Sequence, residues 1–378
     1  MKNKPIIHPT IILGLIFAAL LIIIPVINLI APDREISEIE NRALAQRPSL
    51  NGTALLEGTF SDDFESYESD QFAGRDLLRS VQVFFRWLGG SREENGIYLG
   101  RDGRLLEKIV IPEEALLQNN AAAVNDFAEA HPDLNISFMM VPDAASVYPD
   151  DYPAFAERND QRSCLQDFAS RLDPAVRWID LLPVLESHAD EGMYYKTDHH
   201  WTTAAAHYAY QVYAKENSLQ EAVFKSYPVT DCFTGALSRS TGFCMSETEV
   251  IDIFVPDAPE DLVVSYVNDR KRTTSLYDSS MLDGSDPYQV FMGGNYSLID
   301  IQTAADTDDT LLLFKDSFAN CFIPFLTQHY SRIIVVDPRY YYGNANDLVN
   351  TYAVTDVLFL YSGNTFFRDN NLPGALAQ

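Results

Sequence analysis

Residues 194–210, YYKTDHHWTTAAAHYAY, concentrate groups that can carry out acid–base chemistry. In an extended loop, residues i and i+2 point to the same side and residue i+1 points away. Asp198 and His200 can therefore share a face, with His199 opposed to them. An aspartate beside an imidazole fixes its tautomer and stabilises its protonated form. This spacing predicts His200 as a base and Asp198 as its orienting carboxylate, with His199 either structural or in contact with substrate.

A second reactive group lies more than a hundred residues downstream, in the segment KDSF at 315–318. Ser317 falls where a buried strand gives way to a predicted helix. A helix N-terminus offers free N–H groups and a positive dipole end, which suit an oxyanion forming beside a serine. The segment is not a G-x-S-x-G elbow, which disfavours the α/β-hydrolase fold. The simpler interpretation is that Asp316 or Ser317 only caps the helix.

Metal chemistry is an alternative interpretation of the paired histidines. Asp-His-His also occurs in metal-dependent phosphoesterases, which need further aspartate-rich motifs, and HPDLN at 131–135 is a poor match to them. None of the four cysteines belongs to a C-x-x-C pair, so a zinc site has little support. Cys232 and Cys244 are close in sequence and form the best candidate disulfide. The prediction is that this site uses neither a metal nor a cofactor.

The elements that must position these residues alternate along the chain from about residue 110. Predominantly apolar segments predict buried strands at 136–142 and 310–314 and further strands at 176–181, 332–337 and 356–362. Helical patterns are found at 113–131, near 160–172, and at 202–217, 316–330 and 344–354. Strands of this kind, separated by helices, predict an α/β fold with a parallel sheet covered on both faces. In such sheets function collects at the carboxyl ends of the strands, where both reactive loops fall.

The N-terminal part of the chain has a different composition. Residues 11–31 are uncharged and long enough to span about 30 Å of hydrocarbon. Lys2 and Lys4 precede this run and acidic residues follow it, so the positive-inside rule predicts a cytoplasmic N-terminus and an extracytoplasmic remainder. A cleaved signal peptide is the alternative, with only a weak cleavage site in NLIAPDRE. The net charge of −27 opposes nucleic-acid binding.

These patterns divide the chain into three parts. Residues 1–32 are predicted to form a cytoplasmic tip and a transmembrane anchor, and residues 33–90 a stalk and a helical segment. Residues 91–378 are predicted to form the catalytic domain, with an irregular insertion near 224–290. The predicted location is the cell membrane, with a single membrane-spanning helix.

The segments KTDHHWT and LLLFKDSFANCFIPFL together resemble the DHHW protein family. That family is similar to the SGNH-hydrolase-like alginate O-acetylation proteins of the AlgX/AlgJ type. Asp198, His200, Trp201 and Ser317 match their motifs in the same order, which is circularly permuted relative to ordinary SGNH hydrolases. A second histidine at position 199, where the alginate type has a small residue, is a departure. The resemblance implies an SGNH-like, flavodoxin-like fold.

The resemblance also implies further site residues. SGNH enzymes complete the oxyanion hole with the serine N–H, a glycine N–H and an asparagine side chain. Asn364, beside Gly363 after the last strand, is the candidate donor here, although a plain turn is the alternative. Arg339 follows the strand after the serine and is a candidate for binding a substrate carboxylate or hydroxyl. The substrate-binding candidates also include Trp201, His199 and Asp316.

The resemblance also predicts a function. The resemblance implies a membrane-anchored, extracytoplasmic serine O-acetyltransferase or esterase that acts on a polysaccharide through an acyl-enzyme. A multi-pass membrane O-acyltransferase would be its partner. The alternative is a non-catalytic polysaccharide-binding or scaffold protein on the same fold, in which the triad would be distorted. A metal-dependent phosphoesterase is the third possibility.

Overall fold

The computed structural model describes residues 9–37, 42–50, 52–53, 58–243, 248–257 and 261–377. The chain divides into two compact units. The first contains Met1–Ser91 with Gly242–Cys244, and the second contains Arg92–Thr241 with Met245–Gln378.

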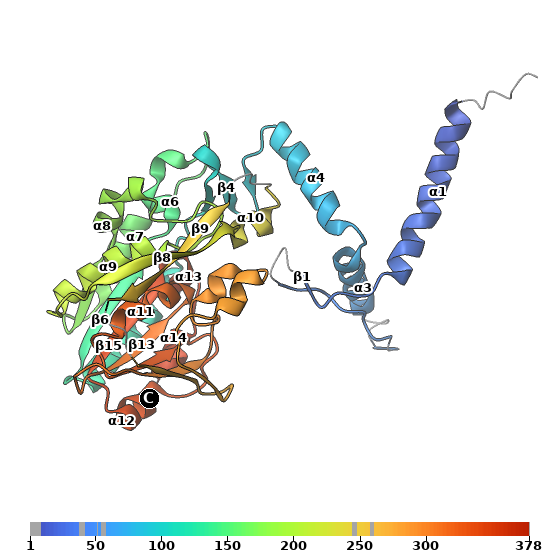
Figure 1. Cartoon of the computed structure of the whole chain (residues 1–378). Helices are drawn as coiled ribbons and strands as arrows, with labels where there is room; N and C mark the ends of the chain where they lie inside the picture. The colour runs from blue at the N-terminus through green and yellow to red at the C-terminus, as the bar shows by residue number, and fades with distance from the viewer. Residues whose placement is uncertain are drawn as a thin grey trace, which may run out of the picture. The chain divides into compact units, whose positions relative to one another are not determined.

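An eight-stranded sheet forms the centre of the second unit, in the order β11-β10-β12-β14-β13-β15-β6-β7 (Figure 1). The five strands from β14 to β7 are parallel, as predicted from their apolar sequences. The sheet is mixed, because β12, β10 and β11 add antiparallel pairs at the β14 edge. The strands are β6 (Asn135–Val141), β7 (Val176–Asp180), β10 (Val263–Tyr266), β11 (Lys271–Thr273), β12 (Leu298–Gln302), β13 (Thr310–Lys315), β14 (Arg332–Val336) and β15 (Asp356–Ser362).

The strand order explains the permuted arrangement of the motifs. The parallel order β14-β13-β15-β6-β7 is the flavodoxin-like order 2-1-3-4-5 if β13 is counted first and β6 and β7 last. The chain thus enters the sheet at its fourth strand. The strand order reverses at β13, and ligands of open α/β sheets bind at the carboxyl end of such a strand. Ser317 follows β13 by two residues.

Alternating side chains bury both faces of the parallel strands. Met139 and Val141 belong to one hydrophobic cluster, and Phe138 and Met140 belong to the other. Helices cover both faces, as predicted. One cluster includes α6 (Ala144–Val147), α8 (Leu182–Ser187), α9 (Thr203–Glu216) and α11 (Ile323–Leu326). The other includes α5 (Glu114–Ala130), α7 (Gln161–Arg171), α12 (Ala345–Tyr352), α13 (Gly363–Phe366) and α14 (Leu372–Leu376).

The helix predicted at 316–330 is wrong in detail. The chain forms a 3-10 turn, η6 (Ser317–Cys321), followed by the short helix α11. Pro324 lies in the first turn of α11, where its missing N–H costs nothing, but it cannot continue a helix that began at residue 317. The consequence is a compact segment after Ser317, with Phe318, Ala319 and Cys321 all buried.

The segment predicted to be an irregular insertion contains regular elements. The strands β8 (Phe224–Phe233) and β9 (Glu249–Pro256) form a bulged hairpin that encloses α10 (Ala236–Thr241). The 3-10 turns η4 (Ser279–Asp283) and η5 (Pro287–Val290) follow. A separate three-stranded antiparallel sheet consists of β3 (Glu93–Glu94), β4 (Ile97–Leu99) and β5 (Leu105–Glu107). The remaining 3-10 turns are η1 (Arg101–Gly103), η2 (Pro149–Asp151) and η3 (Ala189–Glu191).

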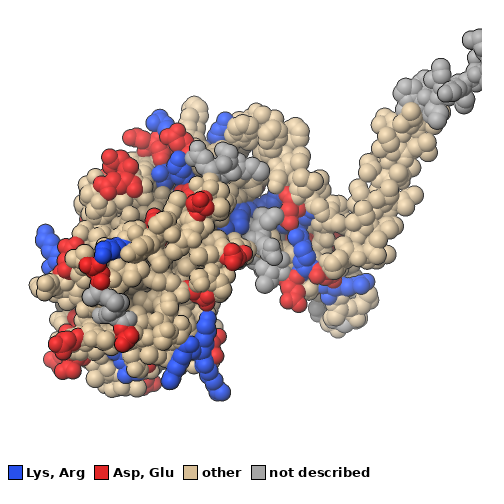
Figure 2. All heavy atoms as spheres, viewed as in Figure 1, with Lys and Arg blue, Asp and Glu red and all other residues tan. Residues whose placement is uncertain are grey.

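The first unit contains the apolar helix α1 (Pro9–Ile30). Its stretch Thr10–Ile30 is long and apolar enough to cross a membrane, with a mean hydropathy of 3.0, although a signal sequence has the same properties. It carries no charged side chain (Figure 2). The strands β1 (Ile36–Ser37) and β2 (Arg42–Ala43) follow, then the helices α3 (Thr59–Gln71) and α4 (Arg75–Leu88). Gly74, at a φ of 80°, separates α3 from α4 within the region predicted as one helix.

Candidate active site

His200 lies between an aspartate and a serine. Its Nδ1 is 2.6 Å from Asp198 Oδ1, and its Nε2 is 2.8 Å from Ser317 Oγ. Asp198 and His200 come from the loop that precedes α9, and Ser317 begins η6. The three residues predicted from spacing therefore lie in one hydrogen-bonded chain, with the geometry of a Ser-His-Asp triad.

The carboxylate of Asp198 is buried and fully engaged. Oδ1 also accepts the His200 N–H at 2.9 Å, and Oδ2 accepts the Ala236 N–H at 2.7 Å. Burial alone would raise the pKa of Asp198, but the charges of His199 and His200 and these hydrogen bonds outweigh it. The pKa of Asp198 is held well below its usual range, so the group stays ionised beside the imidazole.

The hydrogen bond that the His200 N–H donates to Asp198 Oδ1 also shows that the loop is a turn rather than an extended segment. His199 is therefore not opposed to its neighbours, contrary to the expectation from the extended geometry. Its ring centroid is 3.9 Å from that of His200, and its Nδ1 is 3.5 Å from Asp198 Oδ1. Burial lowers the pKa of His199, but the nearby carboxylates, with Asp198 first, outweigh it and raise that pKa above its ordinary value.

Aromatic rings enclose the imidazole of His200. The Tyr288 ring from η5 stacks on it with centroids 3.8 Å apart and planes 12° apart, and the Phe318 ring lies 5.0 Å away. Burial, followed by the charge of His199, lowers the pKa of His200. The imidazole is therefore held in its neutral form, as a base requires. Tyr288 was not predicted, because only the tertiary fold brings η5 to the loop.

Trp201 and Asp316 hold the loop before α9 and the turn that begins at Ser317 in position. The Trp201 indole N–H donates to the carbonyl of Phe318 at 2.9 Å. Asp316 caps η6 by accepting the Phe318 N–H at 2.9 Å, and it accepts the N–H and hydroxyl of Ser362 at the end of β15. Both side chains are fully buried. Trp201 and Asp316 thus hold the reacting groups in place.

The two other predicted site residues, Arg339 and Asn364, line a hollow with a volume of about 330 Å³. His199, Phe318, Arg339 and Asn364 are among the residues that line it. Arg339 forms a bidentate pair with Asp337, with Nε–Oδ1 2.8 Å and Nη2–Oδ2 2.7 Å. The Asn364 side chain accepts the Val110 N–H at 2.8 Å and donates to the Lys108 carbonyl at 3.2 Å.

A buried ammonium group, which was not predicted, lies close to the carboxylate that holds Arg339. Lys315 Nζ donates to Asn295 Oδ1 and Asn320 Oδ1, each at 2.8 Å, and lies 3.6 Å from Asp337 Oδ2. Burial lowers the pKa of Lys315 to about 8, although the charge of Asp337 opposes the shift. Asp337 thus links Lys315, at the end of β13, to Arg339. The apolar strand TLLLFK ends in this lysine, which is the signal that could have identified it.

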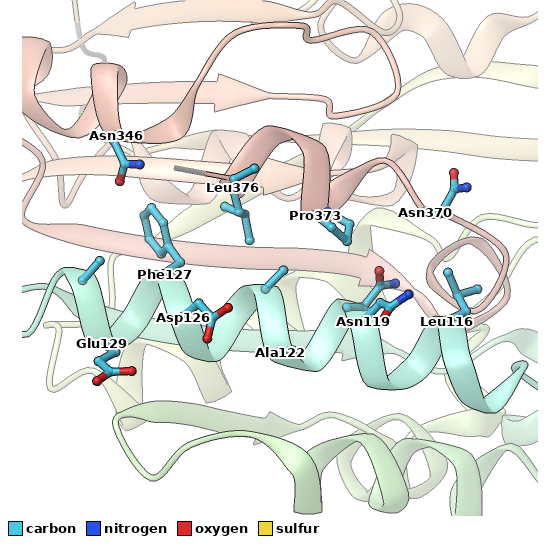
Figure 3. A pocket seen from close by; sticks show the side chains of 14 residues that line it. Leu116, Asn119, Ala122, Asp126, Phe127, Glu129, Asn346, Asn370, Pro373 and Leu376 are labelled. Carbon is cyan, nitrogen blue, oxygen red and sulfur yellow. The ribbon is translucent and has the colours of Figure 1, made fainter.

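A larger hollow, of about 870 Å³, lies away from the triad. Figure 3 shows α5 along one side of it, with Asn119 and Asp126, and the segment with Pro373 and Leu376 on the other. No triad residue lines either hollow, but His199 and Phe318, the sequence neighbours of His200 and Ser317, line the smaller one.

Two further expectations concern metals and disulfides. Ligand atoms of Asp198, His199 and His200 lie within 4.8 Å of one another, a spacing that a metal ion could use. Both ring nitrogens of His200 already have partners in the triad, which a metal would have to displace. Cys232 is a free, exposed thiol, and its predicted partner Cys244 lies outside the described residues.

Comparisons with known proteins agree with this fold. A DHHW family protein from Eubacterium siraeum is 25% identical, with a TM-score of 0.64, covering 74% of this chain and 95% of that one. Bacillus cereus PatB1, solved with a sulfonyl adduct, is 18% identical with a TM-score of 0.63, covering 74% and 97%. The O-acetyltransferase domain of Pseudomonas putida AlgJ is 18% identical with a TM-score of 0.47, covering 73% and 94%.

No curated protein matches the chain. The fold is SGNH-like, with a mixed sheet whose parallel part follows the permuted order described above. The sequence description of the DHHW protein family matches residues 111–336, which is more than half of the chain and contains all three triad residues. The chain therefore belongs to the DHHW protein family.

Proposed function

We propose that this protein is a serine O-acyltransferase or esterase that works through an acyl-enzyme on Ser317. The observation that carries the proposal is the unbroken chain of hydrogen bonds from Asp198 through His200 to Ser317 Oγ. A non-catalytic protein on this fold was expected to show a distorted triad. The distance of 2.8 Å between His200 Nε2 and Ser317 Oγ supports catalysis instead.

The chemistry follows from the positions of the atoms. Ser317 Oγ attacks the carbonyl carbon of an acyl donor while His200 Nε2 takes the hydroxyl proton. Asp198 stabilises the imidazolium that forms. His200 then returns the proton to the leaving oxygen as the tetrahedral intermediate collapses to an ester on Ser317. An acceptor hydroxyl, activated by His200 in turn, takes the acyl group and regenerates the free serine.

The residues that line the hollow receive the substrate in this proposal. Arg339 is anchored by Asp337 through Nε and Nη2, which leaves Nη1 as a donor towards an oxygen of the substrate. Asn364 is held by two backbone groups and keeps one amide hydrogen for the oxyanion or the acceptor. His199 lines the same hollow, and the nearby carboxylates raise its pKa, which favours its protonated form.

The setting of the reaction is also part of the proposal. The acceptor is a cell-surface or secreted polysaccharide, and α1 holds the catalytic unit on the extracytoplasmic side of the membrane. The family membership and the apolar α1 support this setting. A multi-pass membrane O-acyltransferase would supply acyl groups from the cytoplasm. The AlgJ domain, which is described as an O-acetyltransferase, illustrates the reaction class.

The purified protein tests the proposal with an activated acetyl ester, with and without an oligosaccharide acceptor. We expect a single acetyl group on Ser317 by peptide mass spectrometry and a burst of the leaving group. Ser317→Ala should lose both, and Ser280→Ala, at an exposed turn, serves as the matched control. Full activity of Ser317→Ala would exclude the acyl-enzyme. A product that forms only with the oligosaccharide identifies a transferase, and inhibition by a chelator would support the metal alternative.

A further inference from the structure

The helix α4 exposes an apolar stripe of six large side chains. Their spacing of i, i+1, i+4, i+7, i+8 and i+11 places them on one face of the helix. Each is between 43% and 69% exposed. The α4 stripe consists of Leu77, Leu78, Val81, Phe84, Phe85 and Leu88.

The other face of α4 is the one that packs. Val83, on that face, is only 3% exposed, and Arg79 and Ser80 are half-buried. A surface helix of a soluble protein buries its apolar face and presents the polar one to water. In α4 the arrangement is the reverse. A contiguous apolar patch of this kind marks a surface that contacts another phase or another molecule.

The position of α4 in the first unit indicates what contacts the stripe. The N–H of Ala73, two residues before α4, donates to Asn28 Oδ1 in the last turn of α1 at 2.6 Å. Arg34, just after α1, pairs with Asp76 in the first turn of α4 at 3.0 Å. The Gln71 side chain donates to the Arg34 carbonyl and accepts its N–H. The start of α4 is therefore tied to the end of the apolar helix, at the depth where a membrane span meets water.

The remaining residues of α4 suit that depth. The helix carries three arginines and one aspartate, a net charge of +2, in a chain whose net charge is −27. Basic side chains beside an apolar face favour an anionic lipid surface. Phe84, Phe85 and Trp87 supply the aromatic rings that are enriched at the boundary between headgroups and acyl chains.

We propose that α4 is an interfacial helix whose apolar stripe lies among the lipid headgroups and upper acyl chains next to α1. The inference rests on the proposed membrane anchoring by α1, but not on the proposed acyl transfer. Membrane contact then extends from α1 to Leu88. The second unit begins at Arg92, four residues later, so the chain that separates it from the bilayer spans at most about 14 Å. The catalytic unit is thereby kept close to the membrane surface.

The full chain in lipid nanodiscs tests this inference. The discs contain phosphatidylglycerol and phosphatidylcholine, some with a spin label on the upper acyl chain. Serine replaces Cys164, Cys232 and Cys244, and the fully buried Cys321 is kept. A polarity-sensitive fluorophore is attached through Phe84→Cys or Phe85→Cys. Gln82→Cys, on the same helix and also exposed, is the matched control because it lies outside the stripe.

We expect blue-shifted emission and quenching by the spin-labelled lipid at positions 84 and 85, and neither at position 82. Emission typical of water at 84 and 85 would overturn the inference. A blue shift without quenching would overturn it as well, because the stripe would then be covered by protein, such as a second copy. A cooperative thermal transition at the melting temperature of the unchanged chain shows that each variant is folded. If mass spectrometry shows that the chain has lost α1, the proposed membrane anchor is wrong. This result is distinct from one in which α1 is present but α4 does not contact lipid.

Discussion

Asp198 is the residue whose charge controls the state of the triad. It is fully buried, and its two oxygens accept hydrogen bonds from His200 and from the Ala236 N–H. Asp198→Asn keeps the size of the side chain but removes the charge and presents an amide to His200 Nδ1. The imidazole then loses its productive tautomer. We expect the acylation rate to fall by about 10⁴-fold, as such a change does in Ser-His-Asp triads.

The measurement is the rate of acetyl-Ser317 formation from an activated ester. Asp126→Asn, at an exposed position on α5, is the matched control and should leave the rate unchanged. If Asp198→Asn also retained the full rate, the carboxylate would have no catalytic role.

His199 and His200 are coupled through their shared carboxylate, which predicts a pH dependence. Only neutral His200 can accept the serine proton, so kcat/KM should fall as the pH falls through the pKa of this residue. Burial, and then the charge of His199, hold that pKa below its ordinary value. His199→Gln removes the neighbouring charge and should raise the pKa of His200. The acid limb of the pH profile should therefore move to higher pH.

The control for this experiment is His188→Gln, at a histidine that pairs with Glu191 away from the triad. Its pH profile should match that of the unchanged protein. A shift of the acid limb to lower pH in His199→Gln would contradict the assigned direction of the coupling.

Residue types and spacing nominated the triad, and the resemblance to the DHHW family strengthened the prediction, but neither indicated all of the groups around it. Asp198, His200 and Ser317 were predicted because each belongs to a short motif at the end of a clear strand or before a clear helix. The position of His199 was wrong, since an aspartate that accepts the N–H two residues on turns the chain. Tyr288 and Lys315 were missed, because their roles depend on contacts across the fold rather than on neighbours in sequence.

At the scale of elements, the loop between β8 and α10 supports the catalytic aspartate. Gly235 approaches so closely that a Cβ atom there would lie 2.3 Å from Asp198 Cβ and 2.5 Å from the Thr197 carbonyl oxygen. Its N–H also donates to the Thr197 hydroxyl at 2.8 Å. Gly235→Ala must therefore displace the loop that carries Asp198. We expect a loss of Ser317 acylation together with a lower melting temperature.

Gly374→Ala in α14 is the matched control, because nothing lies within 4 Å of its added Cβ. It should keep the activity and leave the melting temperature unchanged or slightly higher, since alanine restricts the unfolded chain. Equal activity of Gly235→Ala and Gly374→Ala would show that the loop tolerates displacement.

The strands that could be predicted from the sequence are those whose side chains are buried on both faces of the sheet. Largely apolar strands predicted the parallel sheet, and side chains that alternate between the two hydrophobic clusters explain why β6, β13, β14 and β15 are largely apolar. The edge strand β7 is the exception, since it exposes Arg177 and Asp180. The strands β10 and β11 were not predicted individually, because both are short and partly exposed; the edge strand β11 exposes Lys271 and Arg272. The hairpin β8–β9 is bulged, which disturbs the alternation by which strands are recognised.

At the scale of the whole molecule, the chain joins an N-terminal unit that begins with the apolar helix α1 to a second unit that has its own core. Both hydrophobic clusters belong entirely to residues after Arg92. The triad and the hollow beside it are also formed by that part alone. The net charge of −27 is compatible with this division, because a large net charge favours solubility but does not determine the fold.

This division predicts that residues 92–378 fold and react without the first unit. The fragment should remain in the supernatant after ultracentrifugation, melt cooperatively and form acetyl-Ser317 at a rate close to that of the full chain. The full chain should sediment with membranes and keep its N-terminus by intact mass spectrometry, since α1 is an uncharged span longer than the apolar region of a typical signal peptide. A mature N-terminus at Pro32 would show instead that α1 is cleaved. A fragment that folds but does not react would place part of the catalytic machinery in the first unit.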